Sequence, residues 1–334
     1  MKKPRSSQTL IDKELRRQRD TCVKQGDEDA AFDEYAAYIG KLNEDLSAKC
    51  AVGDFANAKM SSTNTRILGR YHATCGSFVV NGQQDAAGWK QLDLGAKYAY
   101  WFVKMSLGAR LRALRTCEHA LRLMTEVDIL TSLLCYSYVL DLADWFEELR
   151  SFWGLVASIP GVTMYESISG GEVSKWRNVE PDGFVRSDGH FDRFVTHLFG
   201  GPRFGPPFEL YDEVERLTLG PYQEIVDCWE DEGERFADAL RNIADYHARN
   251  IDNSHNLDLL LPFYHPLISL APWEIGAIYK LRAEAGLQTP EIDHPLMKLP
   301  AAAFEPRTVE PVDDPIFAQL DALYAKNCRI EDYL

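Results

Sequence analysis

Positively charged residues are scarce in this chain of 334 residues, which has 36 Lys and Arg against 51 Asp and Glu and a net charge of −15 at pH 7. Proteins that bind the phosphate backbone of nucleic acids, or an anionic membrane, present basic surfaces. The charge balance therefore argues against both kinds of partner.

Long apolar runs are also missing. The most apolar stretch, residues 129–140, has 12 residues, whereas a transmembrane helix needs about 20. The first 20 residues are basic but contain no apolar core of the kind found in a signal peptide. We therefore expect a cytoplasmic protein.

Cysteine pairing motifs are absent. The seven cysteines are an odd number, and no two of them form a C-x-x-C motif. A disulfide framework or a zinc ribbon requires paired cysteines at short, regular spacings. We expect reduced thiols and neither of these sites.

Sequence motifs for catalysis are missing as well. The chain has no G-x-S-x-G elbow and no H-E-x-x-H zinc motif. Its Gly-Gly pairs, at residues 170–171 and 200–201, are not followed by a P-loop lysine. We predict that the protein is not an enzyme, with no catalytic residues, no bound metal and no cofactor.

Helical periodicity dominates residues 1–150, where only Pro4 precedes Pro160 and apolar residues recur at intervals of three and four. Helices are predicted over residues 10–25, 55–79, 105–124 and 129–142. Two further helices are predicted to begin at residue 27 or 29 and at about residue 85. The Asn81-Gly82 pair predicts a turn. This part is expected to form the N-terminal helical half.

Residues 151–211 differ in composition, with many glycines and prolines among interleaved aromatic side chains. A flexible linker would not carry so many aromatics. We predict an ordered, irregular connection, with a short hairpin or a short helix at residues 190–198.

Residues 212–334 are predicted to form the C-terminal helical half, packed with the first half as one unit. One helix is expected over residues 221–250, a second starts at Pro272 and ends at Gly286, and a last one starts at Asp314-Pro315. The fold class is all-α, a multi-helix bundle or an irregular array of helix pairs.

Carboxylates at Asp141, Asp144, Glu147 and Glu148 recur at helical spacing. Such a face is usually solvated, but Asp141, Asp144 and Glu148 could also hold Mg²⁺ in an all-helical enzyme. A second ligand helix would be needed, and Asp227, Asp231 and Arg235 could supply it.

Negative charge is concentrated in residues 209–245, which contain twelve Asp and Glu and three Arg. This face either keeps the protein in solution or docks a basic partner, since complementary charge raises association rates. Tryptophan is a frequent interface anchor. The candidate partner-binding residues are Asp227, Trp229, Glu230, Asp231, Glu232, Glu234 and Trp176.

Several C-terminal segments resemble the immunity protein 49 family of bacterial polymorphic toxin systems. They lie within residues 230–302, at 236–240, 246–247, 257–262, 278–286 and 293–300, with Gly286 at a helix end and Leu299-Pro300 at the close. A looser similarity covers residues 70–105, around the helix of Trp89. Arg19-Asp20 and residues 32–35 are similar to the helical immunity family of DNase toxins.

Both resemblances imply a non-catalytic cytoplasmic protein that binds one toxin and blocks its active site. The implied partner is a cognate protein toxin with a basic surface, and the oligomeric state stays open. Two alternatives remain: the Mg²⁺-dependent helical enzyme, and an adaptor or scaffold built from helix pairs that binds several partners.

Overall fold

The computed structural model describes residues 6–22, 28–83, 86–114, 124–158, 190–205, 207–208, 218–251, 262–263, 265–304, 307–309 and 314–330. Every regular element in these ranges is a helix, which confirms the all-α prediction. Most of the connection predicted over residues 151–211 lies outside the described residues.

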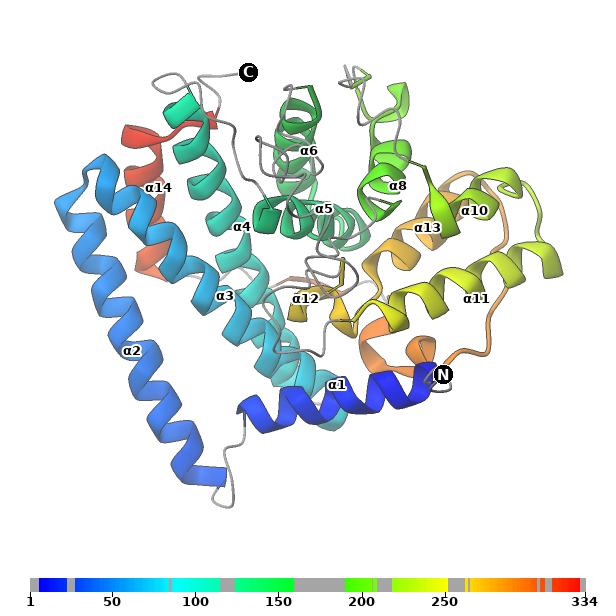
Figure 1. Cartoon of the computed structure of the whole chain (residues 1–334), viewed down its shortest axis with the longest axis horizontal. Helices are drawn as coiled ribbons and strands as arrows, with labels where there is room; N and C mark the ends of the chain where they lie inside the picture. The colour runs from blue at the N-terminus through cyan, green and yellow to red at the C-terminus, as the bar shows by residue number, and fades with distance from the viewer. Residues whose placement is uncertain are drawn as a thin grey trace, which may run out of the picture.

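Six α-helices form the N-terminal part: α1 (Ser7–Cys22), α2 (Glu28–Val52), α3 (Phe55–Gln83), α4 (Ala86–Leu114), α5 (Met124–Val139) and α6 (Ala143–Ser158). Helices α2, α3 and α4 lie side by side (Figure 1). Helix α5 is buried between α4, α6 and the later α13, as its apolar sequence predicts.

The remaining elements are α8 (His190–Phe199), η1 (Pro202–Phe204), η2 (Gly220–Tyr222), α10 (Gln223–Asp227), α11 (Glu234–Arg249), α12 (Pro266–Ser269), α13 (Trp273–Glu284), η3 (Pro295–Lys298), η4 (Pro300–Ala302) and α14 (Pro315–Asn327). Helix α14 returns to pack on α2, α3 and α4. The last described helix is therefore packed on the N-terminal helices rather than in a separate C-terminal layer.

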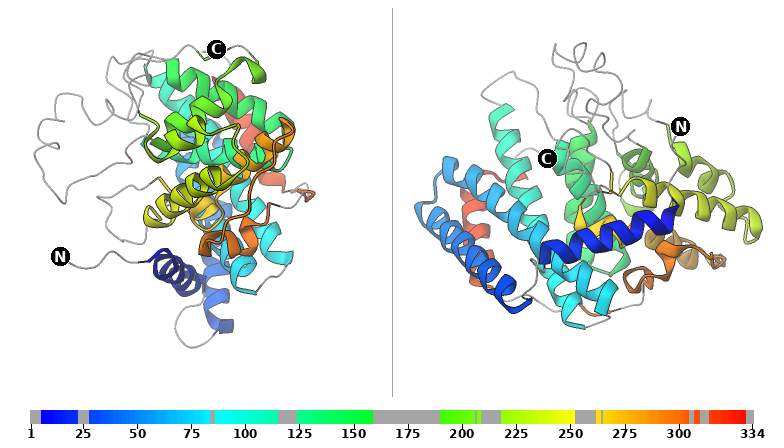
Figure 2. Two further views of the ribbon diagram at one scale, coloured as in Figure 1. Left: turned by 90° about the vertical axis from the view of Figure 1, so that its right-hand side faces the viewer. Right: turned by 60° about the horizontal axis from the view of Figure 1, so that its bottom comes forward.

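Helix α1 bridges the two parts of the molecule. It packs on α3 at one end and on α11 and η3 at the other, and it crosses the lower edge of the fold in the view of Figure 1. The views in Figure 2 agree with this placement. The core consists of one large apolar cluster and a small second one beneath α1, made of Ile11, Ala248, Ile251, Leu270 and Leu296.

Local start and stop signals are confirmed at several helices. The Asp314 carboxylate accepts a hydrogen bond from the backbone N–H of Ile316 (3.0 Å) and caps α14, which begins at Pro315. Gly286 adopts φ +77° directly after α13, as a C-terminal glycine does. The predicted short helix at 190–198 is α8.

Three predicted boundaries are wrong. The chain does not turn at Asn81-Gly82, because α3 continues to Gln83, and the stretch that begins at Met105 continues α4 rather than starting a helix. The predicted helix over 221–250 is broken, since α10 ends at Asp227 and α11 starts at Glu234. In addition, the compositional boundary at 150/151 falls inside α6.

Candidate functional site

The break between α10 and α11 is the acidic stretch itself, which we call the acidic turn (residues 227–234). Gly233 precedes α11 in an extended conformation, and its N–H donates to the Asp231 carboxylate (2.6 Å). Like charges at this density oppose helix formation. The turn thus separates two helices and brings six of the seven candidate partner-binding residues together.

A buried arginine holds the backbone of this turn. Arg282 of α13 is fully buried, and its guanidinium donates to the carbonyl oxygens of Trp229, Asp231 (2.8 Å) and Gln288 (2.6 Å). Its Nε donates to the Thr289 hydroxyl (3.1 Å). Hydrogen bonds from a charged donor are the strong ones, so this single side chain fixes the turn against α13.

Aromatic rings enclose the same guanidinium. The guanidinium carbon of Arg282, Cζ, lies 3.7 Å from the ring centroid of Phe236 and 5.8 Å from that of Trp229. Burial lowers the pKa of Arg282, while the nearby acidic side chains, Glu232 first, oppose the shift. Burial of a cation is costly unless it is hydrogen-bonded, and the turn supplies those acceptors.

The acidic side chains of the turn divide into two groups. Asp231 accepts from Gly233, and Glu232 accepts from the backbone N–H of Gln288 (2.6 Å), so both hold local structure. Asp227, Glu230 and Glu234 are exposed. Their carboxylates present negative charge to solvent, although Glu234 also pairs with Arg241 on α11.

Trp229 is half-buried and packs against the large core through an edge-on contact with Phe236 (ring centroids 6.4 Å apart). It therefore contributes to the packing of the turn, and part of its side chain remains at the surface. The other candidate tryptophan, Trp176, lies outside the described residues.

A cleft of about 600 Å³ adjoins the acidic turn. It opens between the start of α8, η2, α10 and α11, and its lining is mostly polar. The lining residues are His190, Gly220, Pro221, Gln223, Glu224, Asn242, Asp245, Tyr246 and Arg249.

Two residues that line the cleft contact the acidic turn or the residue that follows it. Gln223 donates to the Asp227 carboxylate (2.9 Å), and Glu224 accepts from Arg235 (2.8 Å). The cleft and the acidic turn are therefore neighbours at α10 and the start of α11.

Asp245, which also lines the cleft, connects it to α1 and η3. Its carboxylate accepts from the Ser7 hydroxyl, lies 3.2 Å from Nε2 of His294, and accepts from Arg249 (3.2 Å). Burial acts to raise the pKa of Asp245, but the bonds to Ser7 and His294 outweigh it and lower the pKa. Asp245 is therefore held as a carboxylate at neutral pH.

The proposed magnesium face has other partners. Asp141 pairs with Lys280, and Glu148 pairs with Lys104 (2.7 Å) and accepts from the Tyr100 hydroxyl. Asp144 lies in the first turn of α6 and is exposed. Within the ranges that the structure describes, no group of three or more His, Cys, Asp or Glu side chains is arranged to hold a metal ion.

Sequence patterns did not identify Arg282 or the cleft. The available signal for Arg282 was its place beside the buried Leu281 in a helix whose buried residues, apart from Glu274, are otherwise uncharged. Long charged residues are almost never fully buried unless they are paired. The partners of Arg282 in the acidic turn lie about 50 residues earlier in the chain, while Gln288 and Thr289 are close to it in the sequence. The cleft arises from four separate elements and leaves no local signal.

Among the described residues, no helix combines the length and the hydropathy needed to cross a bilayer. Comparison of the chain with protein-family models, with curated proteins and with solved structures finds no match.

Proposed function

We propose that this protein binds a cognate protein toxin with a basic surface and neutralises it in the cytoplasm by stoichiometric occlusion of the toxin's active site. The protein acts by binding alone, without a cofactor. The observation that carries the proposal is the acidic turn, whose backbone is fixed by Arg282 while Asp227, Glu230 and Glu234 face solvent.

Rigidity and charge serve such a role in different ways. A binding loop that is already ordered loses less conformational entropy when the complex forms, which favours tight binding. A concentrated negative potential attracts a basic partner and raises the association rate. An inhibitor of a toxic enzyme requires both properties, because it must intercept the toxin early and retain it.

The adjoining cleft extends the proposed contact face. Glu224, Asp245 and the aromatic Tyr246 are among the residues that line it. A lysine or arginine side chain projecting from the partner would find acceptors and an apolar surface there. We therefore place the centre of the interface on α10 and the first turns of α11.

The first test is co-expression. The chain is produced together with the products of the genes adjacent to its own, each of which is first tested for toxicity in a bacterial host. We expect one product to be toxic alone, to be tolerated in the presence of this chain, and to co-purify with it at a ratio of one to one. Toxicity that persists in the presence of the folded chain contradicts the proposal.

A second test locates the interface. Asp227→Lys and Glu230→Lys reverse two charges without removing the acceptors that hold the turn. The matched control reverses two exposed carboxylates on α2 and α14, with Glu44→Lys and Asp321→Lys. Stopped-flow association at low salt should slow by about tenfold or more for the first pair and little for the second.

Ionic strength provides the internal check on this experiment. The difference between the two double variants should shrink as salt is raised, because exposed charges are screened over about 8 Å at physiological ionic strength. Equal association rates for the two variants, independent of salt, would place the interface elsewhere.

A further inference from the structure

Two buried thiols meet where α1 ends. The Sγ atoms of Cys22, the last residue of α1, and Cys75, within α3, lie 3.0 Å apart. The exposed fractions of the two residues are 3% and 7%. A disulfide bond has a sulfur–sulfur distance of about 2.05 Å, so a displacement of roughly 1 Å separates this contact from a covalent bond.

The attachment of α1 depends strongly on polar contacts. Its fully buried side chains are Ile11, Glu14, Gln18 and Cys22. Of these four, Ile11 belongs to the small apolar cluster beneath the helix, and the partly buried Leu15 packs against that cluster. Burial of apolar surface is the main source of stability in helix packing. This bridging helix is therefore held less firmly than the core helices.

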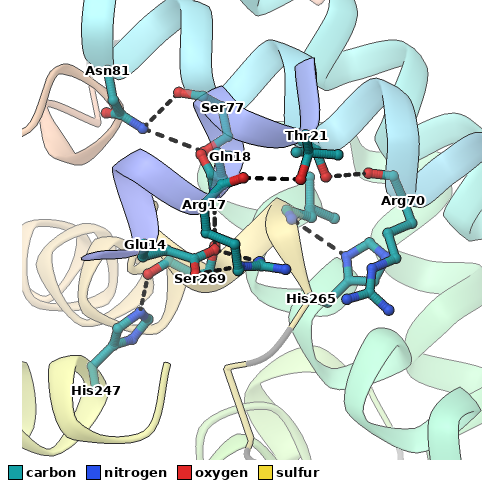
Figure 3. A network of polar contacts seen from close by, with 12 residues as sticks. Glu14, Arg17, Gln18, Thr21, Arg70, Ser77, Asn81, His247, His265 and Ser269 are labelled. Carbon is teal, nitrogen blue, oxygen red and sulfur yellow. Dashed lines mark hydrogen bonds and ion pairs between the residues drawn. The ribbon is translucent and has the colours of Figure 1, made fainter. Parts of the chain in front are cut away.

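Figure 3 shows the polar contacts of α1, some within the helix and some with Ser269 of α12. Glu14 accepts a bidentate pair of hydrogen bonds from Arg17 and lies 3.3 Å from the Ser269 hydroxyl. Gln18 donates to Glu14 and to the Ser269 hydroxyl (both 3.1 Å), and within the described residues its buried Oε1 has no hydrogen-bond partner. An unsatisfied buried acceptor weakens the interface further.

We propose that Cys22 and Cys75 form a reversible intramolecular disulfide when the protein meets a peroxide, and that this bond fastens α1 to α3. The Cys75 thiolate attacks hydrogen peroxide, which yields a sulfenic acid and releases hydroxide. The Cys22 thiol then attacks the sulfenic sulfur, and the sulfenic oxygen leaves as water once the Cys22 proton has been transferred. Overall, two thiols and one hydrogen peroxide give one disulfide and two waters.

The electrostatic environment assigns the roles of the two sulfurs. The hydrogen bond from Cys22 lowers the pKa of the Cys75 thiol, with a further contribution from the Tyr71 side chain. Burial raises the pKa of Cys50 to about 11 and that of Cys328 to about 12. Because the thiolate is the reactive form, Cys75 reacts first among these three.

The position of Cys22 explains how the buried pair is reached. Helix ends open locally at a much lower free energy than helix centres, and opening the last turn of α1 uncovers both sulfurs. Cys50 provides the comparison, because it is only half-buried but has no described thiol neighbour. If exposure alone decided which thiol is oxidised, Cys50 would react first. If a neighbouring thiol decides it, Cys22 and Cys75 react instead.

The test uses the full chain, reduced and then exposed to a modest excess of hydrogen peroxide under native conditions. We expect the thiols titrated after denaturation to fall from the seven in the sequence to about five, since a disulfide consumes two thiols. Trypsin should release residues 20–24 linked to residues 71–90, with a mass two hydrogens below the sum of the peptides. Dithiothreitol should restore both peptides.

Variants separate pairing from general oxidation. Cys22→Ser, a small change at a helix end, should abolish the linked peptide, whereas Cys50→Ser should leave it unchanged. The oxidised wild-type chain should also melt roughly 5 °C higher than the reduced chain, and Cys22→Ser should show no such rise. Absence of the linked peptide, equal yields from the two variants, or a link without a gain in melting temperature would overturn the proposal.

Discussion

A β-carbon on Gly76 would lie 2.3 Å from the backbone nitrogen of Leu92, so α3 and α4 touch backbone to backbone at this point. Gly95 makes the reciprocal contact, since a β-carbon there would lie 2.4 Å from the nitrogen of Ala73. Gly69 and Gly88 extend the series along the same pair of helices. The close packing of α3 against α4 therefore requires glycine at these positions, because any side chain would collide with the backbone of the other helix.

Gly76→Ala should destabilise the protein by about 3 kcal/mol or more, because the backbone of α4 cannot yield as a flexible side chain can. The matched control is Gly40→Ala in α2, where a β-carbon would meet nothing within 4 Å. That change should stabilise by about 0.5–1 kcal/mol through helix propensity. Urea unfolding of both variants measures the contrast, and shifts of the same sign would refute the close contact.

Arg282→Met should cost about 3–5 kcal/mol, because it leaves the carbonyl oxygens of residues 229, 231 and 288 without their charged donor. Arg203→Met removes an exposed ion pair with Glu284 and should cost less than about 1 kcal/mol. Hydrogen exchange adds a local measurement, since the amides of the acidic turn should lose protection in the first variant and keep it in the second.

Asp93 and Arg307 should show strong coupling in a double-mutant cycle. Arg307 donates to both carboxylate oxygens of the buried Asp93 (2.6 Å for Nη1–Oδ2), which also accepts from the Tyr136 hydroxyl (2.6 Å). Arg307→Met alone should cost about 3–5 kcal/mol by leaving a buried charge. The double variant with Asp93→Asn should cost clearly less than the sum of the single changes, and strict additivity would disprove the coupling.

His265 should make the protein sensitive to acid. Burial, with a smaller contribution from Arg70, lowers the pKa of this residue from 6.5 to about 3, and its Nδ1 accepts the Leu267 N–H (3.3 Å) that caps α12. Between these two pH values the unfolded chain binds a proton that the folded chain does not. Stability is thus retained above pH 6.5 and falls with decreasing pH, by about 1.4 kcal/mol per unit within that window.

His265→Asn should keep a capping acceptor and remove this titration. The free energy of unfolding, measured from pH 7 to pH 4, should therefore depend less steeply on pH in the variant, by about one proton. A residual slope should remain, because burial also lowers the pKa values of His72, His197 and His294. An unchanged slope would show that His265 does not supply the acid sensitivity.

Local signals in the sequence were sufficient for much of the helical framework. The Asp314-Pro315 start, the Gly286 stop and the apolar character of residues 129–139 all predicted what α14, α13 and α5 show. These signals work because a helix cap or a glycine stop depends on residues within a few positions of one another.

The same local rules failed where tertiary contacts outweigh them. The Asn81-Gly82 pair is typical of a turn, yet it lies within α3, where the Asn81 side chain donates to the Ser77 carbonyl (3.0 Å) and accepts the Ala301 N–H (3.1 Å). The predicted helix is interrupted at residues 228–233, where like charges are crowded and Arg282 donates to the carbonyl oxygens of Trp229 and Asp231. Ala301 and Arg282 are distant in sequence from the segments that they contact, so no local pattern reveals these contacts.

The sequence by itself thus determined the helical class, the negative charge and the position of the acidic stretch, since these properties follow from composition and short-range periodicity. Only the tertiary structure decided that the stretch is a fixed turn beside a cleft, that α3 and α4 meet at glycines, and that Cys22 faces Cys75. Each of these contacts joins residues that are brought together by the burial of other side chains, and burial is a property of the whole fold.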